Sequence, residues 1–191
     1  MTKNILIIMS FLVLLVGIFD HSLWTPDEPR VAEIARAMAV TGYYLIPHLA
    51  GEPFLEQPPL YYSVTGIFWR VLGTGNEGFD RLSSVLFALG SLMVVFFGMR
   101  SLYDGRTAGM AALMLATTAL FFGTSHKIIV DNALAFFITA ALFSFLLAYR
   151  GILKQGYPLF WLCLAGAFLT KGVIGIAIPG RSEERRVGKE C

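Results

Sequence analysis

The sequence has few cysteines and little charge. Its two cysteines, Cys163 in an apolar run and Cys191 at the last position, give neither a disulfide framework nor a paired-cysteine metal motif. Charged residues make up 15% of the chain, against roughly 25% in soluble domains. The formal net charge is only +2 and no basic stripe is present, which argues against nucleic-acid binding. We therefore expect the partners to be lipids or lipid-linked molecules.

Apolar sequence is abundant instead. Hydrophobic residues make up 56% of the 191 residues, and the mean hydropathy is +0.67. Five apolar stretches are close to the ~20 residues that cross a bilayer: roughly 4–22, 83–100, 107–125, 132–149 and 157–179. The sequence thus predicts an all-α, polytopic transmembrane helical domain, with no internal repeat of the kind that transporters carry.

Basic residues in the short connections predict the orientation of these spans. Lys and Arg concentrate on the cytoplasmic side of membrane proteins, and here they fall on one side of the predicted membrane: Lys3, Arg100, Arg106, Arg150 and Lys154. The amino terminus is therefore expected in the cytoplasm. Residues 23–82 and the loop 126–131 are then expected on the outer side.

Both ends of the sequence leave an alternative open. The first apolar stretch follows Lys3 and could be a cleaved signal peptide, although no small-residue cleavage site follows Phe19. Residues 181–191 hold seven charges and resemble the translation of a sequencing-library adapter. We expect this segment to be non-native and the chain to be a truncated piece that ends naturally near Gly180. The alternative is a genuine basic cytoplasmic tail.

The long outer segment, residues 23–82, carries its own helix signals. Thr25, Pro26 and Glu28 form a predicted capping box, and Gly42 a predicted stop, so that a helix should cover about 26–41. Its apolar residues recur at helical spacing, which is typical of a helix lying in the interface plane. Four prolines then predict a loop from Pro47 to Pro59. A second short interfacial or re-entrant helix is expected over 60–72; if it crossed the membrane, every later span would change sides.

Four landmarks occur in order along the chain: Asp27–Arg30 with Ala32–Met38, Pro53–Tyr62, Asp131 at the start of an apolar helix, and Thr170–Gly172. Together they resemble the amino-terminal part of the bacterial polyprenyl-phosphate-dependent glycosyltransferases. This family includes the lipid A aminoarabinose transferase and the protein O-mannosyltransferases and has the GT-C fold. The resemblance covers residues 1–180. It implies transfer of a sugar from a polyprenyl-phosphate carrier to lipid A, a glycan or a protein on the extracytoplasmic side of the bacterial cytoplasmic (inner) membrane.

This chemistry needs a carboxylate that accepts a proton and cations that stabilise the leaving phosphate. The resemblance assigns the carboxylates to Asp27, as the base, and to Asp131, in the same cavity. Each has an alternative interpretation. Asp27 could merely complement a helix dipole, and Asp131 could merely cap the fourth span.

The resemblance also implies a group of residues that bind the donor phosphate: Glu28, Arg30, Glu56, Gln57 and Lys171. Gln57 departs from the family, since relatives often carry Lys there; it can donate a hydrogen bond but brings no charge. Lys171 is an alternative cation, because an ammonium inside an apolar span usually has a function; it could otherwise extend towards the interface. Three cations are weaker candidates and are otherwise expected to be interfacial anchors: Arg30, Arg81 and Lys127.

No cofactor is certain. His21, His48 and His126 all fall on the predicted outer side, but their spacing matches no metal-ligand motif. A divalent metal held through Glu56 or His48 stays open, since some relatives need one. Two other classes also stay open, a noncatalytic membrane subunit or fragment and a lipid flippase or transporter. This chain alone, without the later spans of its relatives, is expected to be inactive.

Overall fold

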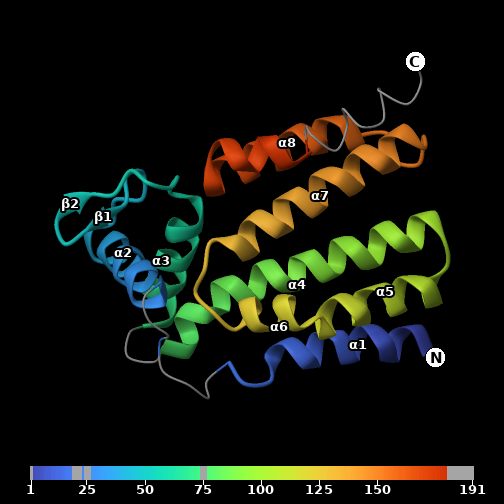
Figure 1. Cartoon of the computed structure of the whole chain (residues 1–191), viewed down its shortest axis with the longest axis horizontal. Helices are drawn as coiled ribbons and strands as arrows, with labels where there is room; N and C mark the ends of the chain where they lie inside the picture. Colours follow the sequence, from blue (N-terminus) through green and yellow to red (C-terminus); the bar gives the residue numbers. More distant parts are fainter. Residues whose placement is uncertain (1, 19–22, 24–26, 74–76, 180–191) are drawn as a thin grey trace.

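The computed structural model describes residues 2–18, 23, 27–73 and 77–179. These residues are mostly helical, with one β-hairpin whose two strands have two residues each (Figure 1). The elements are α1 Thr2–Leu15, α2 Asp27–Thr41, β1 His48–Leu49, β2 Glu52–Pro53, α3 Leu60–Leu72, α4 Glu77–Leu102, α5 Gly105–Thr117, α6 Ala119–Ser125, α7 Asp131–Tyr149 and α8 Gly156–Lys171. The predicted all-α class is confirmed.

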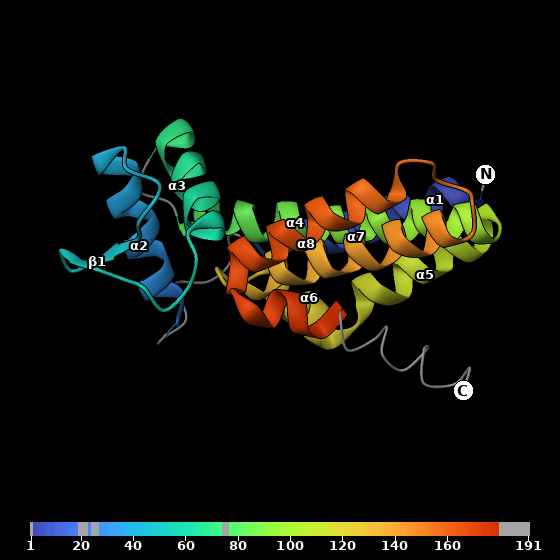
Figure 2. The same ribbon diagram turned by 90° about the horizontal axis from the view of Figure 1, so that it is seen from above.

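The long helices α1, α4, α5, α7 and α8 lie side by side along one axis (Figure 2). Helix α7 packs between α8 and α4, and α4 in turn packs on α5 and α1. Small residues of α5, Ala108, Ala112 and Ala116, are fully buried against Leu92 of α4 and Leu14 of α1. Close helix contact through small residues is typical of membrane bundles. This packing order places α8 at one edge of the bundle and α1 at the other.

Within the described residues, two helices are long and apolar enough to cross a membrane, residues Asp80–Leu102 of α4 and Asp131–Tyr149 of α7. A third crossing is possible if α5 and α6 count as one span, although they bend by 68° at Thr118. The span predicted over 107–125 therefore corresponds to two helices at an angle and not to one straight helix. The hydroxyls of Thr117 and Thr118 donate to Leu113 O and Met114 O one turn back, a bond that often bends helices.

The predicted first and fifth spans are also shorter than expected. Helix α1 has 14 residues and ends at Leu15 rather than at 22, and α8 has 16 and ends at Lys171 rather than at 179. Gly172 ends α8 with a φ of +65°, a backbone conformation that favours glycine. Residues 173–179 are helical again but fold back on α8. Gly175 lies so close to this helix that an added Cβ would clash with the Ala167 carbonyl. Hydropathy alone detects neither break.

Phenylalanines of α7 fill spaces that glycines leave open on both neighbouring helices. On α4, a Cβ on Gly90 would lie 2.8 Å from Phe136, and a Cβ on Gly98 would clash with the Phe143 ring. On α8, a Cβ on Gly166 would lie 2.5 Å from Phe137. These glycines therefore set how closely α4 and α8 approach α7.

We expect Gly98→Ala to destabilise the bundle by about 1–3 kcal/mol, because the added methyl group overpacks the contact with Phe143. Thermal unfolding of the purified protein in detergent would measure the loss. Gly123→Ala on α6 is the matched control, since nothing lies within 4 Å of its Cβ position. Equal melting of the two variants would contradict this account of the α4–α7 contact.

Helices α2 and α3 and the hairpin form a separate unit at one end of the bundle, and α3 runs across the bundle axis (Figure 2). The predicted helix over 60–72 is confirmed, as is the end of the preceding helix at Gly42, whose N–H bonds to Met38 O. The apolar stripe of α2 is buried under protein. Ile34 and Met38 pack against Tyr61 and Tyr62 of α3 in one core cluster.

The hairpin of this unit was not predicted, and the predicted capping box is not fully described by the structure. The predicted loop over 47–59 contains the hairpin, in which Ala50 and Gly51 both have positive φ, as a two-residue turn of type I′ requires. Thr25 and Pro26, on which the predicted capping box depends, lie outside the described residues.

Candidate active site

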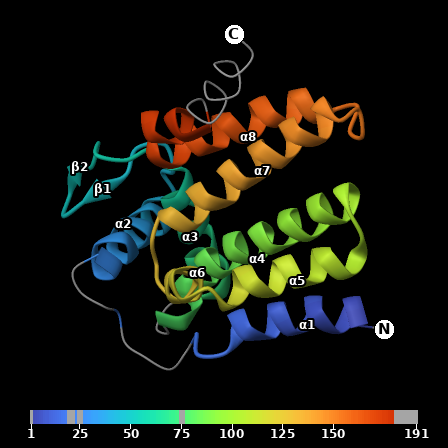
Figure 3. The ribbon, with the colours of Figure 1, turned by 45° about the vertical axis from the view of Figure 1, so that its right-hand side comes forward.

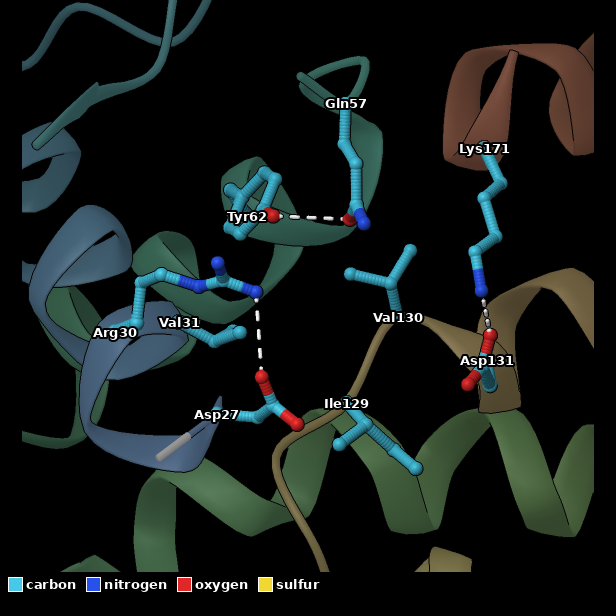
Figure 4. Close-up of a pocket in the computed structure, with 9 residues that line it drawn as sticks. All are labelled: Asp27, Arg30, Val31, Gln57, Tyr62, Ile129, Val130, Asp131 and Lys171. Atoms are coloured by element: carbon cyan, nitrogen blue, oxygen red, sulfur yellow. Dashed lines mark hydrogen bonds and ion pairs between the residues drawn. The ribbon is translucent and has the colours of Figure 1, made fainter. Parts of the chain in front are cut away.

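A pocket of about 170 Å³ lies where the α2–α3 unit meets the ends of α7 and α8 (Figure 4). Four segments far apart in the sequence converge there: the first turn of α2, the loop before α3 with the start of α3, the connection into α7, and the last residue of α8. The lining residues are Asp27, Arg30, Val31, Gln57, Tyr62, Ile129, Val130, Asp131 and Lys171. Both predicted catalytic residues and three of the five predicted donor-binding residues are among them.

One side of the pocket carries an ion pair within α2. Arg30 Nη2 lies 3.3 Å from Asp27 Oδ1, one helical turn away. Arg30 Nη1 also lies 3.9 Å from Glu56 Oε2, and its guanidinium is 5.9 Å from the centre of the Phe54 ring. Arg30 is thus held near two carboxylates while 41% of its side chain stays exposed. It is a pocket cation, not an interfacial anchor.

The opposite side carries a second ion pair, between the Lys171 ammonium and the Asp131 carboxylate (Figure 4). Asp131 is the first residue of α7 and Lys171 the last residue of α8, so the break at Gly172 places this lysine at the pocket. Asp27 and Asp131 each lie in the first turn of a helix, which agrees with a dipole interpretation. The N-cap residue of α7 is Val130, so the capping interpretation of Asp131 is wrong. Both acids also face the pocket with a cation beside them, which the dipole interpretation does not require.

Gln57 and Tyr62 border the pocket between the two ion pairs. The Tyr62 hydroxyl donates to Gln57 Oε1 at 3.0 Å, which orients the Gln57 amide nitrogen as a donor (Figure 4). Burial raises the pKa of Tyr62 to about 12, with the positive charge of Arg30 opposing the rise. The hydroxyl therefore stays protonated at neutral pH. The sequence predicted no site role for Tyr62, which lies in the helix expected over 60–72.

We expect Tyr62→Phe to raise the KM for the donor by about 3- to 10-fold, because one net hydrogen bond of about 0.5–1.5 kcal/mol no longer orients Gln57. A raised pKa means that the protonated donor is fully present below the ordinary tyrosine value and is lost only as pH rises towards 12. The ratio of wild-type to variant activity should thus be constant between about pH 6 and 9. A ratio that changes across this range would contradict the assignment.

Two predicted donor-binding residues do not line the pocket. Glu56 is exposed beside it and reaches it only through Arg30. Glu28 is 1% exposed, and its Oε1 lies 3.5 Å from Arg81 Nε and accepts a 2.8 Å hydrogen bond from Ile128 N. This position contradicts the prediction that Glu28 contacts the donor, because protein covers its carboxylate. Arg81 is likewise fully buried and is not an interfacial anchor.

The donors present do not fit a divalent metal ion. Among the described residues, no three His, Cys, Asp or Glu side chains converge to hold one. His48 Nδ1 lies 2.9 Å from Ile46 O, and His126 Nε2 lies 2.7 Å from Val16 O. His21 lies outside the described residues. In the pocket itself each carboxylate has a cation beside it, and a metal ion would have to replace that cation.

The chain is similar to known proteins over most of its length. Residues 56–180 match the family described as dolichyl-phosphate-mannose-protein mannosyltransferase. The undecaprenyl phosphate-alpha-4-amino-4-deoxy-L-arabinose arabinosyl transferase of Aeromonas salmonicida is 32% identical over 183 residues, which cover 94% of this chain and 34% of the relative. The enzyme of the same name from Edwardsiella ictaluri is 33% identical, covering 93% of this chain and 32% of the relative.

A solved structure agrees with these sequence matches. The crystal structure of ArnT from Cupriavidus metallidurans bound to undecaprenyl phosphate superposes with a TM-score of 0.83 at 27% identity, covering 93% of this chain and 34% of that one. The structure of the same protein in the apo state superposes equally well, at 26% identity. The chain thus spans about a third of the length of these relatives. Since the family match covers well over half of the residues, this chain belongs to the dolichyl-phosphate-mannose-protein mannosyltransferase family of polytopic GT-C membrane proteins.

Proposed function

We propose that the complete protein is a glycosyltransferase that moves a sugar from a polyprenyl-phosphate carrier to an acceptor. One observation carries the proposal: Asp27 and Asp131 come from separate segments and border a single pocket together with Arg30 and Lys171. Two carboxylates and two cations are the groups that this displacement needs. Membership of a family whose named relatives use undecaprenyl phosphate-linked sugars supports the same activity.

In the proposed reaction, the bond between the sugar's anomeric carbon and the phosphate oxygen breaks while the acceptor oxygen bonds to that carbon. Asp27 takes the proton of the acceptor, and the carrier leaves as polyprenyl phosphate. Arg30 and Lys171 stabilise the leaving phosphate, and the Gln57 amide donates a hydrogen bond to it. To do so, both cations exchange a carboxylate for the phosphate. Donor binding would thereby release Asp27 and Asp131 from their ion pairs.

We further propose that the pocket faces the outer side and the amino terminus the cytoplasm. The start of α1, the α4–α5 connection and the α7–α8 connection lie at one end of the bundle, and the α2–α3 unit lies at the other (Figure 3). The first end carries Arg100, Arg106, Arg150 and Lys154. The excess of basic residues on the cytoplasmic side of membrane proteins supports this orientation.

The substrates follow from the relatives as a proposal. The names of the bacterial relatives make 4-amino-4-deoxy-L-arabinose the first sugar to test, with lipid A, a glycan or a protein as the acceptor. No step of the proposed reaction is assigned to a divalent metal ion, since no group of three ligating side chains converges among the described residues.

The experiment compares envelope lipids and glycoproteins by mass spectrometry between a strain lacking the full-length gene and its parent. We expect one class of molecule to lose a single sugar in the deletion strain. Purified full-length protein should then release polyprenyl phosphate only when donor and acceptor are both present. Unchanged envelopes together with no release of polyprenyl phosphate would contradict the proposal and favour a noncatalytic membrane subunit.

A further inference from the structure

A buried carboxylate lies directly next to the pocket without lining it. Glu28 follows Asp27 in the first turn of α2, and its side chain turns inward, away from the pocket. Its Oε1 accepts the 2.8 Å hydrogen bond from the backbone N–H of Ile128. The same oxygen lies 3.5 Å from Arg81 Nε at the start of α4. One carboxylate oxygen thus joins three segments that are 53 and 100 residues apart in the sequence.

The segment that Glu28 holds is the one that carries the second pocket acid. Ile128 precedes two pocket-lining residues, Ile129 and Val130, and Asp131 follows them directly at the start of α7. Asp27 is thus the sequence neighbour of Glu28, and Asp131 is three residues after Ile128. The Glu28–Ile128 hydrogen bond therefore joins the two segments that carry the candidate catalytic carboxylates. Because backbone positions so close in sequence move together, this bond restrains the distance between Asp27 and Asp131.

Arg81 keeps the Glu28 carboxylate in place. It is fully buried and its Nη1 donates to Ile18 O, beyond the end of α1, at 3.1 Å. The neighbouring layer between α3 and α4 is also polar and buried: the Tyr61 hydroxyl lies 2.6 Å from Ser84 Oγ, and Thr65 Oγ1 donates to Ser83 Oγ. Buried polar contacts of this kind need their partners, because an unsatisfied group costs free energy. The α2–α3 unit is thereby fixed on the bundle at one defined position.

We propose that Glu28 is a positioning residue that sets the spacing of the two pocket carboxylates, Asp27 and Asp131, by binding the Ile128 backbone. The catalytic meaning of this spacing rests on the proposed glycosyltransferase function. The structural part of the proposal, the link between α2 and the segment that leads into α7, does not. A shift of about 1 Å in a reacting group can cost on the order of 100-fold in rate.

The test compares two double variants of the full-length protein, Glu28→Gln/Arg81→Met and Glu28→Leu/Arg81→Met. Both remove the buried ion pair and are matched in charge, but only the first keeps an oxygen that accepts from the Ile128 N–H. Spin labels at Val40 on α2 and Ala135 on α7, both exposed, report the distance between these helices by pulsed EPR in a cysteine-free background.

We expect the Gln variant to keep the wild-type distance distribution and the Leu variant to broaden or shift it. With the shift, kcat of the Leu variant should be at least about 10-fold below that of the Gln variant, with a smaller change in KM. Glu33→Leu is the control, because it removes a partly exposed acid of the same helix that pairs only within α2, with Arg36. It should change neither measurement.

A Leu variant with the wild-type distance distribution, or with the kcat of the Gln variant, would overturn the proposal. If the Leu variant cannot be purified, Glu28→Asp replaces it: the charge beside Arg81 stays, and the carboxylate becomes one methylene group too short for Ile128. The same shift in distance and kcat is expected. Wild-type protein without any transferase activity would count against the proposed function, while the EPR comparison would still decide the role of Glu28.

Discussion

Asp27→Asn should lower kcat for sugar transfer by about 100- to 10,000-fold, the range that a positioned general base contributes. Asparagine has nearly the shape of aspartate and can still accept a hydrogen bond, but it cannot take the proton of the acceptor. Its effect on donor binding should be small, since Arg30 stays near Glu56 at 3.9 Å. The loss should therefore appear in kcat far more than in the KM for the donor.

The measurement is initial transfer rates by full-length protein in detergent or nanodiscs, with Glu33→Gln as control. Glu33 lies on the same helix, is paired with Arg36, and does not border the pocket. The Arg36 hydrogen bond lowers the pKa of Glu33, so that Glu33 is charged at neutral pH. Near-native rates for Asp27→Asn would remove it as the base and leave it the simpler role of complementing the α2 dipole.

Local signals predicted the α2–α3 unit well. The four prolines between 47 and 59, the glycine at 42 and the helical spacing of Val31, Ile34 and Met38 act within one or two helical turns. They can thus be recognised without knowing the fold. The same holds for the ends of α4 and α7, where basic residues and apolar runs coincide. The structure confirms these elements within a few residues.

The breaks in α5–α6 and after α8 could not be predicted by counting apolar residues. A hydropathy window gives the same result for a straight and a reversed helix, because it depends only on the residues in the window and not on the backbone path. The turn at Gly172 depends on one residue with positive φ, and glycine is also common inside membrane helices. The position of Lys171 in the pocket follows from that turn, so sequence reasoning could name this lysine as a candidate but could not find its partner.

The missing partners are all distant in the sequence. Lys171 pairs with Asp131, 40 residues away, and Arg81 with Glu28, 53 residues away. Nothing in their local sequence distinguishes a buried, paired arginine from one at the interface. The resemblance to a family selected the correct acids for the pocket. It also included Glu28, since a motif cannot tell which of two adjacent carboxylates faces the pocket and which faces the core.

The buried pair makes Arg81 the position where substitution should cost the most stability. We expect Arg81→Met to lower the free energy of unfolding by about 3–5 kcal/mol, the typical result when one partner of a buried ion pair is removed. The Glu28 carboxylate would be left in the protein interior without the guanidinium beside it, and Ile18 O would lose its hydrogen bond. Methionine fills much of the space, so the loss should come from electrostatics rather than from a cavity.

Thermal unfolding in detergent would measure this loss, with Arg36→Met as control because its exposed pair with Glu33 should contribute little. The double variant Glu28→Gln/Arg81→Met should recover most of the stability, since replacing both charges removes the buried carboxylate that has lost its guanidinium, while the amide oxygen at position 28 still accepts from the Ile128 N–H. Recovery in the double variant would show that charge, not packing, makes the single variant unstable. If Arg81→Met unfolds at the wild-type temperature, the buried pair does not hold the α2–α3 unit on the bundle. The fixed spacing of Asp27 and Asp131 would then have to come from the Glu28–Ile128 hydrogen bond and the apolar contacts of Val31, Ile128 and Val130, without help from Arg81.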